Sequence, residues 1–212
     1  MTYVLIPGAG GEGWYWHRVV PLLQDAVAID LPGPDPAAGL PEYAELVLAA
    51  AADRERVVLV AQSMGAFTAL QACERLAPER LVLLNAMIPA PGETAGAWWE
   101  NTGWPRPEGF SVETHFLHDV PPEIAAASAD HAHDEADMAF EQPCDFERWP
   151  DIPTTVTAGR DDRFFPIEFQ RRVARERLGL EVVELPGGHL NALSEPEAVA
   201  SAVADASAGR RR

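Results

Sequence analysis

The stretch "VVLVAQSMGAF", Val57–Phe67, places a serine between an apolar run and a glycine. The run Val57–Ala61 has the length and β-branched composition of a buried strand, and helical apolar spacing follows Gly65. A serine at the tip of such a strand–turn–helix exposes its hydroxyl as a nucleophile. The alternative is an ordinary buried strand followed by a serine that caps a helix.

Small residues must flank a serine in this position, because the turn is strained and the following helix passes close to the strand. In the nucleophile motif Gly-x-Ser-x-Gly these positions are glycines. Gly65 satisfies this requirement, and Ala61, at the position of the first glycine, adds only one methyl group. We therefore interpret Ser63 as a candidate nucleophile.

Short apolar strands alternate with helices through most of the chain, which is typical of a parallel sheet covered on both faces. We predict strands over Tyr3–Ile6, Val27–Ile29, Val57–Ala61, Leu81–Leu84, Thr154–Ala158 and Val182–Leu185. We predict helices over Trp14–Leu23, Glu42–Ala52, Ala66–Leu76, Pro166–Leu178 and Glu195–Ala206. The fold class is α/β, with about six mostly parallel strands in one domain over residues 1–212.

The alternation breaks down from about Ile88 to Pro150, a segment rich in proline, glycine and tryptophan. It is too long for a plain loop, so we expect a small helical lid inserted after the fourth strand. Trp98, Trp99 and Trp104 belong either to the core of this lid or to an apolar substrate pocket, since ligand sites commonly use aromatic side chains.

Composition excludes several classes of function. A net charge of −17 disfavours nucleic acid and anionic membranes as partners. We find no membrane-spanning stretch and no signal peptide. The two cysteines, far apart in the chain, predict a reduced, cytoplasmic thiol pair. All 16 basic residues are arginine, which indicates a GC-rich bacterial genome. The oligomeric state is not indicated.

Polar residues follow three of the predicted strands. Ser63 follows the third strand, Asp161 and Asp162 the fifth, and His189 the sixth. Catalytic side chains on open parallel sheets lie beyond these carboxyl ends. A serine hydroxyl needs a base, and an imidazole base needs a carboxylate that fixes its tautomer. The order serine, acid, histidine predicts a catalytic triad.

With these motifs in place, the chain resembles the α/β-hydrolase superfamily over nearly its whole length. "VLIPGAGGEGWYWHRVVPLL" followed by "AIDLPG" is similar to the opening of its small esterase and hydroxynitrile lyase branch. "GRDDRFFP" resembles the acid loop and "GGH" the histidine loop. Ala61 departs from the pattern, and the absence of lysine counts against the cyanide chemistry of the lyases.

The resemblance also assigns the remaining site residues. The acid lies three residues after a glycine and four before a proline, which selects Asp162. Asp161, or an acid in the region of "NAM" after the fourth strand, stays an alternative. The backbone N–H groups of Ala9 and Met64 are assigned to the oxyanion hole. No cofactor and no metal are implied.

The leading hypothesis is a serine hydrolase, specifically a carboxylesterase that acts on a small to medium apolar ester through an acyl-enzyme. One alternative uses the same triad on a lactone, thioester or amide. The other is a small-molecule receptor on the same scaffold without turnover. Fold-level analogy does not supply the natural substrate.

Two motifs suggest other functions. "GAGGEG" fits G-x-G-x-x-G after a strand, but the acidic residue expected roughly 20 residues further on is missing, so dinucleotide binding is disfavoured. "DHAHD" carries His131 and His133 in an acidic region, which invites a metal interpretation. We expect these histidines to lie on a solvated face instead.

Overall fold

A single parallel sheet of six strands organises the protein in the computed structural model, which describes residues 1–208. The strand order is β2-β1-β3-β4-β5-β6. The strands are β1 (Thr2–Ile6), β2 (Ala26–Ala28), β3 (Val57–Gln62), β4 (Arg80–Leu84), β5 (Thr154–Gly159) and β6 (Val182–Leu185). The α/β architecture predicted from the alternating pattern is confirmed.

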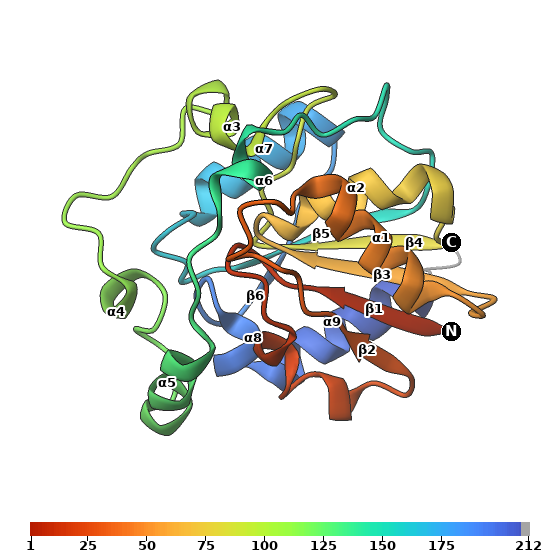
Figure 1. Ribbon diagram of the computed structural model, residues 1–212. Helices are drawn as coiled ribbons and strands as arrows, with labels where there is room; N and C mark the ends of the chain where they lie inside the picture. The colour runs from red at the N-terminus through yellow and green to blue at the C-terminus, as the bar shows by residue number, and fades with distance from the viewer. Residues whose placement is uncertain (209–212) are drawn as a thin grey trace.

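Helices cover both faces of the sheet (Figure 1). One face carries α1 (Leu40–Ala51), α2 (Gly65–Leu76) and α7 (Ile167–Leu178). The opposite face carries η1 (Gly13–Trp16), α8 (Asn191–Ser194) and α9 (Pro196–Ala208). Alternate residues of β1 belong to the two cores, with Val4 in one and Leu5 in the other. The central strands are apolar throughout because both of their faces are buried.

The helix predicted over Trp14–Leu23 is wrong. The segment forms two short 3₁₀ turns, η1 and η2 (Val20–Leu22), separated by His17–Val19. Pro21 explains the break, because proline has no N–H to donate and its ring clashes with the carbonyl four residues earlier. The apolar spacing is still used, since Trp16 and Val19 are fully buried against the sheet.

The segment between β4 and β5 folds into short helices and lies beyond one end of the sheet (Figure 1). These are α3 (Ala95–Asn101), α4 (Val112–His115), α5 (Pro122–Ser128), η3 (Ala129–His131) and α6 (Asp137–Glu141). We call residues 88–150 the inserted segment. A nearly buried ion pair between Glu93 and Arg177 of α7 joins its start to the sheet domain.

The order of the strands creates a crevice for a ligand. After β1 the chain moves outward to β2 and then returns to place β3 on the other side of β1. Ligands of open parallel sheets bind at such a switch point, beyond the carboxyl ends of the strands. In residues 1–208, no helix has the length and apolar character that crossing a membrane requires.

Candidate active site

The turn after β3 holds Ser63 in a strained backbone conformation. Its φ is 51°, in the left-handed region that residues with a side chain rarely adopt. Gly65 permits the close approach of β1 to this turn, because a Cβ there would lie 2.4 Å from the carbonyl oxygen of Pro7. The methyl group of Ala61 is completely buried in the core on the α2 face of the sheet. Alanine is thus accommodated at the position where the motif has glycine.

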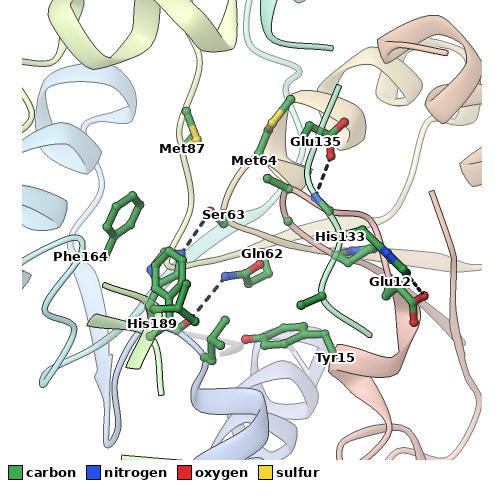
Figure 2. Close-up of a pocket in the computed structure, with 18 of the residues that line it drawn as sticks. Glu12, Tyr15, Gln62, Ser63, Met64, Met87, His133, Glu135, Phe164 and His189 are labelled. Carbon is green, nitrogen blue, oxygen red and sulfur yellow. Dashed lines mark hydrogen bonds and ion pairs between the residues drawn. The ribbon is translucent and has the colours of Figure 1, made fainter. Parts of the chain in front are cut away.

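A hydrogen-bonded chain connects Ser63, His189 and Asp162. The Nε2 atom of His189 lies 3.2 Å from Ser63 Oγ (Figure 2), and its Nδ1 atom lies 2.8 Å from Asp162 Oδ2. All three residues are buried. An imidazole held by a carboxylate on one nitrogen and facing a hydroxyl with the other has the geometry of a general base beside a nucleophile.

The two adjacent aspartates of the acid loop, Asp161 and Asp162, have different surroundings. Asp162 Oδ1 accepts hydrogen bonds from the backbone N–H groups of Phe164 and Phe165, each at 2.8 Å. Gln170 of α7 reaches Asp162 Oδ2 at 3.3 Å. Asp161 is exposed and contributes its backbone N–H to Gly187 O instead. The structure therefore brings Asp162, and not Asp161, to His189.

Asn85, which follows β4, supports the loop that carries His189. Its backbone is left-handed, with φ at 45°, and its side chain is fully buried. Its Nδ2 atom donates to His189 O at 2.9 Å, and its Oδ1 atom accepts from Gly159 N at 2.7 Å. Asn85 is the first residue of the "NAM" region considered above for the acid, and it joins the ends of β4 and β5 to the histidine loop.

The inserted segment supports the same loop from outside. Asp119 Oδ2 accepts hydrogen bonds from the backbone N–H of Gly188, at 2.6 Å, and from Ser194 Oγ, at 2.8 Å. Its other oxygen lies 3.8 Å from His118 Nε2, and neither of these two buried atoms has a hydrogen-bond partner within residues 1–208. A carboxylate of the inserted segment thus holds the residue next to His189.

The loop after β1 approaches Ser63 from the opposite side. A Cβ on Gly8 would lie 2.4 Å from Gln62 Oε1 and 3.0 Å from Ser63 Cβ, so a larger residue there would crowd both side chains. Ala9 and Met64 line the same cavity as Ser63. The backbone N–H of Gly10 donates to Glu135 Oε2 at 2.8 Å (Figure 2), and the other oxygen of Glu135 accepts from the Tyr43 hydroxyl. A second carboxylate of the inserted segment therefore holds this loop.

A cavity of about 1190 Å³ opens above Ser63, and the inserted segment forms part of its wall. Trp99 and Trp104 line it, as one of the two interpretations of the tryptophans predicted. Trp98 does not. It is fully buried, and its Nε1 atom donates to Ile88 O at 2.9 Å. Consecutive residues on a helix point in different directions, so α3 turns Trp98 into the core and Trp99 toward the cavity.

The histidines of "DHAHD" keep much of the solvent exposure expected of them, since His133 is exposed and the side chain of His131 is 35% exposed, but both also contact an acid. His131 Nδ1 and His133 Nε2 contact the two carboxylate oxygens of Glu12, at 2.7 and 2.8 Å, at the cavity wall. The hydrogen bond from His131 is the main reason why the pKa of Glu12 lies below its ordinary value. Among residues 1–208, no group of three or more histidine, cysteine or acidic side chains is arranged to hold a metal ion.

Three residues of this site were not identified from the sequence as its supports. The sequence does indicate Asn85 as a candidate site residue, because it is a polar residue directly after a buried strand. No such signal indicates Asp119 and Glu135, since they lie in a segment without periodicity and act on loops that are distant in sequence.

Comparisons with known proteins identify the family and the fold. Residues 3–202 match the alpha/beta hydrolase family. A rice protein (Oryza sativa subsp. indica) named probable esterase PIR7A is 37% identical in an alignment of length 111 that covers 44% of this chain and 42% of the rice protein. The chain thus matches less than half the length of that relative.

Two solved structures show the same fold. Polyneuridine aldehyde esterase superposes with a TM-score of 0.83 at 21% identity, covering 97% of this chain and 98% of that one. A pyrethroid hydrolase from Sphingobium faniae JZ-2 gives 0.81 at 24% identity, covering 100% and 99%. By the match over residues 3–202, the chain belongs to the alpha/beta hydrolase family.

Proposed function

We propose that this protein is a serine hydrolase, specifically a carboxylesterase that cleaves small to medium apolar esters through an acyl-enzyme. The observation that carries the proposal is the buried hydrogen-bonded chain from Ser63 through His189 to Asp162. The esterase names of the rice relative and of one structural neighbour favour an ester as the substrate. Residues 1–212 are proposed to act as one domain.

Each of the three hydrogen-bonded residues has a distinct role in this mechanism. Ser63 Oγ attacks the ester carbonyl while His189 Nε2 takes its proton. The same nitrogen then gives that proton to the leaving alcohol as the ester C–O bond breaks. Asp162 keeps the Nδ1 proton of His189 in place and stabilises the imidazolium. Water, activated by His189, then hydrolyses the acyl-enzyme and releases the acid.

The backbone N–H groups of Ala9 and Met64 are proposed to hold the oxyanion. Met64 is the residue after the nucleophile and the N-cap of α2, where the helix dipole favours negative charge. Backbone donors aimed at the developing charge act strongly inside a cavity that excludes water. Gly8 allows the loop after β1, which carries the Ala9 N–H, to lie against Ser63.

Other nucleophiles fit the structure less well. Cys73 and Cys144 are buried and free, and neither lines the cavity. Burial raises the pKa of Cys73 to about 12, so its reactive thiolate is scarce at neutral pH. The same triad on a lactone, thioester or amide remains the enzymatic alternative, and binding without turnover is the alternative from another class.

A panel of esters, lactones, thioesters and amides tests the proposal, with the Ser63→Ala protein as the blank. We expect wild type to turn over short-chain aryl esters. Ser63→Ala should reduce turnover to at most the roughly 10³–10⁴-fold acceleration over water that survives loss of a triad member. Ser128→Ala is the matched control, because Ser128 lines the same cavity and, within residues 1–208, its Oγ bonds only its own helix, at Ala125 O. Ligand binding without turnover by wild type would favour the receptor.

A further inference from the structure

The cavity above Ser63 is chemically divided, and this division indicates which half of the substrate is aromatic. We infer that the enzyme prefers esters whose leaving alcohol carries an aromatic ring and whose acyl group is small. This inference rests on the proposed function, since it assumes that His189 protonates the leaving group.

Five aromatic side chains form one continuous surface that begins at His189. We call them the aromatic wall: Trp99, Trp104, Phe110, Phe116 and Phe164. The ring of Phe116 stacks on the imidazole of His189, with centroids 5.0 Å apart and planes 22° apart. The ring of Phe164 meets the same imidazole edge-on at 5.2 Å.

The wall continues outward from these two contacts. Trp104 lies 4.9 Å from Phe164, and Trp99 lies 4.7 Å from Trp104. Phe110 is 5.5 Å from both Phe116 and Phe164. A further ring beside His189 would make offset or edge-to-face contacts with Phe116 and Phe164, the geometries that aromatic pairs prefer.

The opposite side of Ser63 has a different character. Figure 2 shows Phe164 on the His189 side of the serine, and Glu12, His133 and Glu135 across from it. The cavity wall there consists of the loop that contains Gly8 and Ala9, of polar side chains between residues 131 and 135, and of Trp14, whose ring is already stacked on His131 with centroids 4.5 Å apart. An aromatic ring on that side would desolvate carboxylate and imidazole groups without replacing their hydrogen bonds with water.

Proton transfer decides which half of an ester lies on each side. When the tetrahedral intermediate collapses, the ester C–O bond breaks and the alcohol oxygen takes the proton from His189 Nε2. That oxygen must therefore lie within hydrogen-bond reach of Nε2. The alcohol's carbon chain then extends along the aromatic wall, while the acyl group stays bonded to Ser63 Oγ, away from His189.

Benzyl acetate and methyl phenylacetate separate the two orientations, because these isomers differ only in which half carries the ring. Their kcat/KM values, each divided by the rate constant for hydrolysis of the same ester by hydroxide, give a ratio free of intrinsic reactivity. A hydrophobic pocket discriminates a single methylene by roughly 10- to 200-fold. We therefore expect a ratio of at least about 10 in favour of benzyl acetate.

The wall variants Phe164→Ala and Phe116→Ala should lower this ratio at least several-fold. Phe140→Ala is the matched control, because Phe140 lines the cavity but makes no ring contact with the wall within residues 1–208. It should keep the wild-type ratio. Since both esters are assayed on one preparation, a partly unfolded variant still gives a valid ratio.

A ratio near or below 1 for wild type, or equal loss of activity toward both esters in the two wall variants, would overturn the inference while leaving the serine mechanism intact. Turnover of neither isomer and of no p-nitrophenyl acetate would instead contradict the proposed function, and the inference with it.

Discussion

The backbone N–H of Gly188 donates a hydrogen bond to the carboxylate of Asp119, with a nitrogen–oxygen distance of 2.6 Å. Gly188 precedes His189 in the chain, and Asp119 comes from the inserted segment. The segment that forms part of the cavity wall therefore also holds the loop that presents the imidazole. The contact between Glu135 and Gly10 does the same for the loop after β1.

Asp119→Ala should lower kcat by about tenfold or more with a smaller change in KM. Loss of a hydrogen bond to a charged group is worth about 1.5–3 kcal/mol, and a misplacement of 1 Å near the reacting atoms costs about 10²-fold. Asp119→Asn, which keeps one acceptor oxygen, should recover part of the loss. The exposed Asp130→Ala serves as control. Equal kinetics for Asp119→Ala and wild type would show that the contact does not position His189.

Asp162→Asn and Asp161→Asn test the assignment of the acid. Asparagine preserves the shape of Asp162 but favours the wrong histidine tautomer. The same change lowered kcat by about 10⁴-fold in another triad enzyme. Asp161 is exposed, and in the described part of the chain its hydrogen bond is made by its backbone N–H to Gly187 O, so its substitution should lower turnover by less than about tenfold. Steady-state kinetics on one ester decide between them. The reverse ranking would move the acid to Asp161.

Glu135→Gln should stabilise the protein at neutral pH. Burial raises the pKa of Glu135, although hydrogen bonds from Tyr43 and from the Gly10 N–H act in the other direction. A carboxyl with a raised pKa stabilises the fold below its unfolded pKa, about 4.3, and this contribution is lost as pH rises through the folded pKa. Glutamine mimics the protonated form.

Urea unfolding between pH 4.5 and 8 measures this effect. The increase in the free energy of unfolding caused by Glu135→Gln should grow with pH and vanish near pH 4.5. Glu141→Gln, at an exposed site, should show no such trend. A variant less stable than wild type at pH 8 would contradict the expectation.

Glu93 should have the opposite pH dependence. Burial acts to raise its pKa, but hydrogen bonds from Arg177, the Ala90 N–H and Asn101 outweigh it, so the pKa lies below its ordinary value. A carboxyl whose pKa is lowered in the folded state stabilises the fold at pH values above its unfolded pKa. This contribution is lost as pH falls through the folded pKa.

The Glu93→Gln variant should therefore be destabilised at pH 7. Breaking a fully buried ion pair lowers the free energy of unfolding by roughly 3–5 kcal/mol. The loss here should not exceed that range, because the side chain of Arg177 keeps 15% exposure. The difference from wild type should shrink below about pH 4 in urea unfolding. Glu147→Gln, at an exposed position, is the control. A constant difference across this range would refute the assigned role.

Local signals explain what could be predicted from the sequence. The strands and the positions of Ser63 and His189 follow from apolar runs that end in polar residues. The resemblance of "GRDDRFFP" to the α/β-hydrolase acid loop selected Asp162 over Asp161, and the structure buries Asp162 beside His189. Such features depend on neighbours within a few residues, so the chain itself displays them.

The contacts of the inserted segment lacked such signals. Asp119 and Gly188 are 69 positions apart, and Glu135 and Gly10 are 125 apart. Nothing in the composition of the inserted segment indicates which of its many acids face inward. The same limit applies to Trp98 and Trp99, where only the packing of α3 decides which of the two reaches the cavity.

Labelling with a fluorophosphonate tests most directly the claim that His189 activates Ser63. Cleavage after arginine yields the peptide Val57–Arg75, in which Ser63 is the sole serine, so mass spectrometry locates the adduct. We predict one adduct per chain on this peptide, with labelling slowed by about 10²–10⁴-fold in His189→Ala. An adduct on another residue, or undiminished labelling of Ser63→Ala, would contradict the account.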